Sequence, residues 1–357
     1  MDFVLSDKID NLEFELKELF YLYNDLTIKD IKNYLDGAKK FYSIEEIECA
    51  VNILLVDYGI IVRDDFWEKD AVYHYVANSY YQDSAFTRHY YSFTVDNTSN
   101  KKILLISDTH IGNPELENFS MLHNIYDYAL KKGVNKCFHL GDIFSRLDYD
   151  KWNRDKIEKQ LALFGRYYPD CTEIDTYSLI GNHDEYFNGF LTYDKMINIP
   201  IEYDLRQLSR YVSNFYVIPR TGWNIDFSNV KMHLSHKLYL NWMIRDKKLN
   251  NLEEMKYNNF FDGMDYNLLI SGHLHQGFIY NYVCNKQDHL FLGVPSATRL
   301  NQNGVVAYIV SLNYNDLGEV DYFDVSLLLS DDNNKIYEGE TINWNFQGKN
   351  KSLKKTF

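Results

Sequence analysis

The sequence has few cysteines and no long apolar segment. Its four cysteines lie far apart and form no C-x-x-C pattern, which argues against a disulfide framework and a thiolate zinc site and fits a reducing compartment. No run of 18 apolar residues occurs, so we expect no membrane-spanning helix. The first ten residues, MDFVLSDKID, lack the basic start and the apolar run of a signal peptide. These absences predict a cytoplasmic protein with no membrane partner.

Basic residues are scarce as well. The 357 residues include 37 Lys and Arg against 51 Asp and Glu, a formal net charge of −14. Residues 1–100 hold 9 basic and 19 acidic residues, a balance of −10, whereas the other 28 basic and 32 acidic residues balance at −4. An acidic surface repels nucleic acid and anionic membranes, so indiscriminate binding of polyanions is disfavoured. Most of the negative charge therefore belongs to the first part of the chain.

Length and sequence pattern together predict the domain organisation. A chain of 357 residues with 45% hydrophobic residues can form one large domain and one smaller domain with a sizeable core. We expect an acidic helical module over residues 1–100, a large domain over residues 101–330, and a polar, solvated tail over residues 331–357.

The first hundred residues have the pattern of three helices followed by a hairpin. Thr27 is placed to cap the second helix, and Ser43 with Glu46 forms an S-x-x-E capping box before the third. The segments GIIVRDDFW and AVYHYV then predict a hairpin. Over roughly residues 8–80 this pattern resembles a winged-helix module. Because the third helix and the hairpin are acidic, we expect a protein partner or self-association, with DNA binding as the alternative.

From residue 101 onward, apolar strands alternate with helical segments expected at 119–131, 153–166 and 252–261, which predicts an α/β domain. Five strands run directly into side chains that can bind metal: KKILLIS into Asp108 and His110, CFHL into Asp142, YSLI into Asn182, His183 and Asp184, VKMHLS into His236, and YNLLIS into His273 and His275. Alternate residues of an extended segment point to one side, so D-x-H and H-x-H should each direct two ligands at one place. Sites gather at such carboxyl ends, so we expect the five sets to converge.

The order D-x-H, G-D, G-N-H-D, H, G-H-x-H resembles the motif set of the calcineurin-like metallophosphoesterase superfamily. The resemblance covers roughly residues 101–325. It implies an α/β fold, namely a four-layer α/β/β/α sandwich of two mixed sheets with a two-metal site above the sheets. It also implies the role of each motif residue: Asp108, His110 and His275 as ligands of the first metal, Asp142 as the carboxylate that bridges both metals, Asn182, His236 and His273 as ligands of the second, and His183 as the catalytic histidine beside the substrate.

The isolated histidine of this motif set has two candidates, because His233 and His236 both lie in MHLSHK. We prefer His236, since it falls where the apolar run stops and ligands gather at strand ends. His233 would then be a structural histidine of the strand. The histidines without a partner at ligand spacing are interpreted as structural: His74, His89, His123, His139 and His289.

The resemblance implies a cofactor and a reaction. Imidazole and carboxylate ligands suit two divalent metal ions, with Mn²⁺ preferred and Zn²⁺ or Fe as the other choices. A hydroxide that bridges the two metals would attack phosphorus, and His183 would assist the departure of the leaving group. Asp184 and Asp148 are the candidates to orient His183, and Asp184 is included among the catalytic residues.

Departures from the protein phosphatases of the superfamily narrow the substrate. Those enzymes carry G-D-x-x-D-R-G and G-N-H-E, whereas this chain has Ser145 at the second Asp, Arg146-Leu147 at the Arg-Gly, and Asp184 at the Glu. The forms G-D-x-F and D-T-H-I-G resemble the phosphodiesterases and DNA-repair exonucleases instead. We therefore expect a phosphate-ester substrate, preferably a diester and including nucleotides or nucleic acid, with Phe144, Tyr186 and Phe187 as candidate substrate walls.

Two other functions remain as alternatives. The first is a DNA or RNA nuclease of the same superfamily, which the nearly neutral charge beyond residue 100 permits. The second belongs to another class: a catalytically silent binding or regulatory protein that acts through residues 1–100. The retention of every expected metal ligand argues against this second alternative.

Overall fold

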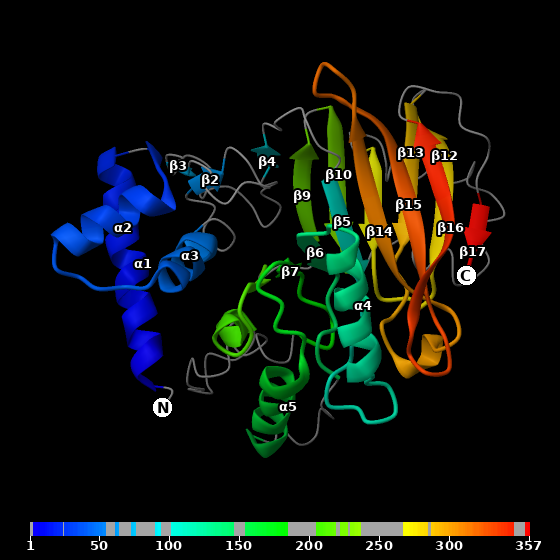
Figure 1. The fold of residues 1–357 in the computed structure, drawn as a ribbon, viewed down its shortest axis with the longest axis horizontal. Helices are drawn as coiled ribbons and strands as arrows, with labels where there is room; N and C mark the ends of the chain where they lie inside the picture. Colours follow the sequence, from blue (N-terminus) through cyan, green and yellow to red (C-terminus); the bar gives the residue numbers. More distant parts are fainter. Residues whose placement is uncertain are drawn as a thin grey trace. The chain divides into compact units, whose positions relative to one another are not determined.

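The computed structural model describes residues 3–23, 25–54, 61–63, 73–75, 90–93, 101–145, 154–184, 205–218, 222–227, 229–236, 267–284, 287–345 and 354–357. The chain divides into two compact units (Figure 1): Met1–Asp96 with Asn224–Ser228, and Asn97–Trp223 with Asn229–Phe357. All the described motif residues belong to the second unit.

The first unit contains three helices and a small antiparallel sheet of order β1-β3-β2. Its elements, in chain order, are α1 (Phe3–Tyr23), β1 (Asp25–Leu26), α2 (Ile28–Gly37), α3 (Ile44–Ile53), β2 (Ile61–Arg63) and β3 (Tyr73–Tyr75). Both predicted helix starts are confirmed, because Thr27 with Asp30 and Ser43 with Glu46 form reciprocal capping boxes. The predicted hairpin is confirmed by the antiparallel pairing of β2 with β3.

Two seven-stranded mixed sheets dominate the structure. The first has the order β16-β15-β14-β5-β6-β7-β8, built from β5 (Lys101–Ile106), β6 (Lys136–His139), β7 (Asp175–Ser178), β8 (Phe215–Val217), β14 (Val305–Tyr314), β15 (Val320–Ser330) and β16 (Ile336–Asn345). The second has the order β17-β12-β13-β11-β10-β9-β4, built from β4 (Tyr90–Phe93), β9 (Gly222–Phe227), β10 (Val230–Ser235), β11 (Leu268–Ser271), β12 (Phe278–Cys284), β13 (Gln287–Gly293) and β17 (Lys354–Thr356). The expected α/β fold of two mixed sheets is confirmed.

The two sheets face each other across an aromatic layer. Trp223 of β9 lies 5.7 Å from Phe138 of β6 and 5.8 Å from Tyr177 of β7, measured between ring centroids. Helices α4 (Phe119–Lys131) and α5 (Arg154–Tyr167) pack on the other side of the first sheet, in one core cluster with Leu104 and Cys137. Strands buried on both faces are apolar throughout, which explains the run in KKILLIS. The helix expected at 252–261 lies outside the described residues.

Strand direction brings the motif loops to common edges. In the first sheet β5, β6, β7 and β8 are mutually parallel, and in the second sheet β10, β11 and β13 are parallel. Parallel strands end at the same edge of their sheet. The segments that follow β5, β6 and β7 therefore leave from one edge, and those that follow β10 and β11 leave from another.

The expectation of a solvated polar tail over residues 331–357 was wrong for its described parts, residues 331–345 and 354–357. β16 pairs antiparallel with β15 along its length, and β17 pairs with β12. The reason is that Ile336, Ile342 and Trp344 are buried at intervals among polar residues, with Trp344 stacked on Phe323 at 5.4 Å. Only one face of this edge strand meets the core, so its composition is mostly polar.

Candidate metal centre

The motif side chains lie on loops that are tied together through their backbones. After β5, the N–H of Asp108 donates to the carbonyl of Gly141 (3.0 Å), and the N–H of His110 donates to the carbonyl of Asp142 (3.1 Å). These bonds continue the pairing of β5 with β6 beyond the last strand residues. Backbone hydrogen bonds alone therefore fix the D-x-H and G-D motifs relative to each other.

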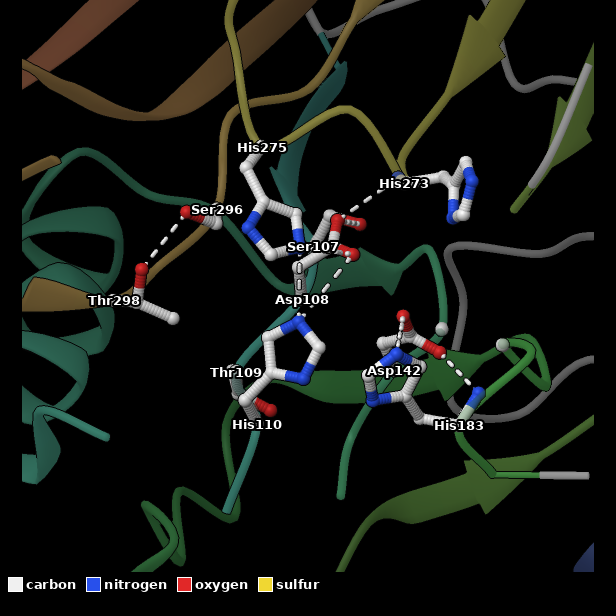
Figure 2. A network of polar contacts seen from close by, with 12 residues as sticks. Ser107, Asp108, Thr109, His110, Asp142, His183, His273, His275, Ser296 and Thr298 are labelled. Carbon is white, nitrogen blue, oxygen red and sulfur yellow. Dashed lines mark hydrogen bonds and ion pairs between the residues drawn. The ribbon is translucent and has the colours of Figure 1, made fainter. Parts of the chain in front are cut away.

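The first group of donor atoms contains Asp108, His110 and His275 (Figure 2). The Nε2 atoms of His110 and His275 lie 2.9 Å apart. Oδ1 of Asp108 lies 3.4 Å from Nε2 of His275 and 3.9 Å from Nε2 of His110. Asp108 and His110 come from the first sheet and His275 from the second, so the group joins the two sheets.

The second group contains Asp142, His236 and His273. Oδ2 of Asp142 lies 3.3 Å from Nε2 of His236, and Oδ1 of Asn182 lies 3.0 Å from the same nitrogen. The other ring nitrogen of His236, Nδ1, donates to the carbonyl of Leu140 (2.6 Å), which leaves Nε2 as its ligand atom. His236 therefore lies with the other predicted ligands, while His233 is in none of the groups found among the described residues.

Asp142 and His183 connect the two groups. A third set of donor atoms consists of His110, Asp142 and His183, so Asp142 shares one set with a residue of the first group and another with His236. The backbone N–H of His183 donates to Oδ1 of Asp142 (2.8 Å), while its Nε2 lies 4.0 Å from Oδ2. The His183 side chain is 27% exposed, whereas the Asp142 side chain is 1% exposed. His183 thus combines a fixed backbone with an imidazole that solvent reaches.

The ligand-bearing backbone is strained where the sequence predicted extended segments. Asp108 (φ 53°), His110 (48°), His273 (74°) and His275 (60°) all have positive φ, as does Asp142 (53°). The expectation that D-x-H and H-x-H direct their side chains through strand alternation was therefore wrong. The left-handed conformation is uncommon for residues other than glycine and costs about 1–3 kcal/mol each. Such a concentration of strain is typical of functional sites.

Glycine is required where two motif loops touch. A side chain at Gly181 would overlap the backbone and carboxylate of Asp142, and one at Gly141 would meet the backbone of Gly181 and the ring of His236. Gly141 also has φ of 89°, which disfavours any side chain there. The G-D and G-N-H-D motifs therefore need glycine for the close approach of two loops.

Burial and charge set the protonation of the site. Burial lowers the pKa of His110 to about 4, so its imidazole is neutral at pH 7. Burial acts in the same direction on His236, but its bond to Asp142 and the charges of Asp108 and Asp142 outweigh it and raise the pKa to about 9. Burial opposes ionisation of Asp108, but the neighbouring His275 and His236 hold its pKa below the usual range. Asp108 is thus charged, and His236 must release its Nε2 proton before that nitrogen can bind a cation.

Asp184 joins two motif loops. Its Oδ2 accepts from the N–H groups of Ile143 (3.1 Å) and Gly181 (2.9 Å), and its Oδ1 accepts from that of Phe144 (2.9 Å). Burial and the charge of Asp142 nonetheless raise the pKa of Asp184 to about 7. These bonds join the backbones of the two loops, and the catalytic role expected of Asp184 from the sequence stays a prediction. Asp148, the other candidate to orient His183, lies outside the described residues.

Of the three residues expected to line the substrate site, the structure describes only Phe144. Phe144 is fully buried in the core of the second unit, where its ring lies 5.8 Å from that of Phe164 on α5. Its assignment as a substrate wall was therefore wrong, because no part of the ring reaches solvent. Tyr186 and Phe187 lie outside the described residues.

Sequence reasoning missed several supporting residues. Ser107 donates its hydroxyl hydrogen to Asp108 Oδ2, which also accepts from the N–H of His273 (3.0 Å). Oγ1 of Thr109 lies 3.1 Å from Nε2 of His139 and donates to the carbonyl of Ile143 (3.0 Å). His139 is structural, as expected, but it supports the site. Ser107 and Thr109 flank Asp108 in sequence, and that adjacency is the signal by which they could have been found.

The donor atoms fit divalent cations. Oδ1 of Asp108 is buried and has no hydrogen-bond partner within the described residues, although two imidazole nitrogens lie nearby. A buried carboxylate oxygen in that situation costs free energy unless a cation occupies the space between the groups. Imidazole and carboxylate donors suit borderline metals such as Mn²⁺, Zn²⁺ and Fe. The residues present therefore match the metal dependence that the sequence pattern implied.

Two mixed sheets with carboxylates and imidazoles converging at their strand ends define a metal-dependent phosphoesterase. A model of the calcineurin-like phosphoesterase family matches residues 101–311, and the chain belongs to this family. It is therefore a hydrolase that acts on phosphoric ester bonds. Among the described residues, no helix has both the length and the apolar character needed to cross a membrane.

Solved structures share parts of this fold at low identity. A dimetal phosphatase from Danio rerio is 10% identical over 69% of this chain and 99% of its own, with a TM-score of 0.37. Yfce, a phosphoesterase from E. coli, is 10% identical over 68% and 98%, with a TM-score of 0.31. GAP50, the anchor in the inner membrane complex of Plasmodium, is 12% identical over 71% and 90%, with a TM-score of 0.35. No curated protein sequence matches the chain.

Proposed function

We propose that this protein hydrolyses a phosphodiester with two divalent cations, Mn²⁺ foremost, held by the seven predicted ligands. The observation that carries the proposal is the position of Asp142, which shares one set of donor atoms with His110 and another with His236 and His273. A carboxylate with two oxygens can serve two cations at once. Asp108, His110 and His275 would hold one cation, and Asn182, His236 and His273 the other.

The chain's own residues divide the chemical work. When bound, the two cations would supply Lewis acidity toward the phosphoryl oxygens and a water of lowered pKa as nucleophile. Asp142 holds His183 through its backbone N–H, and the partly exposed imidazole of His183 can reach the leaving oxygen. His183 would donate a proton to that oxygen and stabilise negative charge on the phosphoryl group.

The preference for a diester is supported by the region around His183. The position of the protein phosphatases' orienting Asp is taken by Ser145, whose N–H donates to the carbonyl of Ile111 (2.9 Å) and whose carbonyl accepts from Gln160 (2.9 Å). Asp184 uses both carboxylate oxygens on backbone N–H groups. The arrangement that serves protein phosphatases is thus replaced, which agrees with the phosphodiesterase-like motif forms.

Hydrolysis of a small diester tests the proposal. Purified protein with Mn²⁺ should hydrolyse bis(p-nitrophenyl) phosphate with a higher kcat/KM than p-nitrophenyl phosphate, and a chelator should abolish both activities. A panel of cyclic nucleotides and single- and double-stranded oligonucleotides, assayed on the same sample, separates a small-molecule esterase from a nuclease. A higher kcat/KM for the monoester would contradict diester preference, and no turnover of any ester by Mn²⁺-loaded protein would contradict the catalytic proposal.

We also propose that the first unit is a winged-helix-like module that binds protein in preference to DNA. The element order α1, β1, α2, α3, β2, β3 supports the resemblance. The balance of −10 over residues 1–100 opposes contact with phosphates. The full chain should therefore not shift duplex DNA in a gel assay at physiological salt. A shift that persists at that salt, and that is lost on truncation of residues 1–96, would refute the charge argument.

A further inference from the structure

The segment from Ser296 to Asn301 joins the loops that carry the first group of ligands. Ser296 forms a parallel bridge with Ser107, and the N–H of Ala297 donates to the carbonyl of Ser107 (2.9 Å). On its other side, the N–H of Ser296 donates to the carbonyl of His275 (3.3 Å). Figure 2 shows Ser296 beside His275, with its hydrogen-bond partner Thr298 on the side away from Ser107. This segment therefore links the loop after β5 to the loop after β11.

The carboxamide of Asn301 makes a shorter hydrogen bond to His275 than the N–H of Ser296 does. Its Nδ2 donates to the carbonyl of His275 (2.8 Å) and lies 2.9 Å from the carbonyl oxygen and 3.0 Å from the hydroxyl oxygen of Ser296. Ser296 is fully buried, and its hydroxyl also bonds to Thr298 (2.9 Å). The backbone N–H of Asn301 donates to the carbonyl of Thr298 (3.1 Å), which fixes the base of the side chain.

The contact matters because His275 has the strained conformation described above, with φ of 60°. A left-handed residue persists only where surrounding contacts hold its backbone. The carbonyl of His275 is the backbone group that defines the direction of the next peptide, and Asn301 holds it. Without that bond, only the longer bond from the N–H of Ser296 (3.3 Å) would hold this carbonyl. His275 would then be freer to relax toward a right-handed or extended conformation, which would turn its imidazole away from Asp108 and His110.

We propose that Asn301 is a positioning residue for the metal centre: its carboxamide holds the backbone of His275 so that Nε2 points at the first cation. The proposal rests on the proposed two-metal function and adds a residue outside the motif set. Groups that orient a ligand typically change metal affinity or activity by about 10–100-fold when they are removed. Loss of the Asn301 contact should therefore weaken one cation site selectively.

The test compares Asn301→Asp with Gln302→Glu in the full chain. Asn301→Asp keeps the shape of the side chain but removes both donors. Gln302→Glu is the matched control, because Gln302 donates its amide to a backbone carbonyl (Asp332, 2.8 Å) that carries no ligand. Mn²⁺ titration followed by the electron paramagnetic resonance of the free ion counts the bound ions. Asn301→Asp should weaken one of two ions about 10–100-fold and leave the other unchanged, while Gln302→Glu should bind both ions as the wild type does.

A second variant guards against a trivial loss of folding. Circular dichroism of each variant in chelator shows whether it folds without metal. If Asn301→Asp does not fold, Asn301→Ala replaces it, because it removes the same donors without adding a charge. It should show the same selective weakening of one Mn²⁺ ion. Two ions bound with wild-type affinity in a folded Asn301 variant would overturn the proposal, and so would equal weakening of both ions. If the wild type binds two ions but hydrolyses no ester, the function proposed above fails, while the titration still decides the role of Asn301.

Discussion

Asp142→Asn should lower kcat for a phosphodiester by about 10³-fold or more. The side chain keeps its shape, and its oxygen can still accept the N–H of His183. It loses the negative charge that lies 3.3 Å from His236 and the second oxygen that would serve the other cation. At 1.36 kcal/mol per tenfold, a 10³-fold loss corresponds to about 4 kcal/mol of transition-state stabilisation.

Metal content separates this explanation from a general loss of structure. Asp142→Asn should bind Mn²⁺ with lower affinity at both sites, because Asp142 belongs to donor sets on both sides of the centre. Asp324→Asn is a matched control: Asp324 accepts from the side chains of Asn313 and Asn343 on neighbouring strands and belongs to no donor set among the described residues. It should retain wild-type kcat and metal content. Wild-type metal affinity at both sites in Asp142→Asn would rule out a bridging role.

His183→Ala should lower kcat by about 10²–10⁴-fold while both cations remain bound. The backbone N–H that donates to Asp142 is retained in the variant, so the geometry of the carboxylate is preserved. The substitution removes the imidazole of His183, which is partly exposed to solvent. Its ring centroid lies 4.8 Å from that of His110. The loss therefore reports on chemistry at the substrate and not on assembly of the metal centre.

The leaving group provides the sharper readout for His183. If the imidazole donates a proton, an ester with a poor leaving group such as an alkoxide should lose more activity than a p-nitrophenyl ester, whose anion leaves without protonation. His123→Ala serves as the control, because His123 lies on α4 and bonds through Nε2 to the carbonyl of Tyr167 (2.9 Å). It should behave as the wild type. An equal loss for both leaving groups would assign His183 an electrostatic role without proton donation.

Local sequence signals predicted much of the fold. The helix at 119–131 was predicted to the residue, Thr27 was predicted as the cap of the second helix, and the Ser43–Glu46 capping box was predicted from side chains three positions apart. The strands before the motifs were recognisable because they are short, apolar and bounded by glycine and polar residues. These features depend on neighbours within one or two turns of chain, which a sequence displays directly. β16 was missed because its three buried residues are spread among polar ones.

In the site, too, local features were predictable from the sequence and long-range contacts were not. The chemistry and order of Asp108, Asp142 and His275 were visible in the sequence, since ligand types and strand ends are local properties. The contacts that hold them were not. Asn301 meets the carbonyl of His275 across a separation of 26 residues, and Asp184 meets Ile143 across 41. No sequence pattern indicates which backbone group a distant polar side chain will reach.

The sequence by itself determined which atoms can bind metal and on which loops they lie, because side-chain chemistry and strand periodicity are properties of short segments. Only the tertiary structure decided how those atoms are aimed. It placed Asp108, His110 and His275 in left-handed conformations and buried Phe144 in the core. It also let the carboxylate of Asp184 bond to backbone N–H groups of two loops. The physical reason is that a strained backbone is maintained by long-range contacts, and these exist only once the two sheets have packed together.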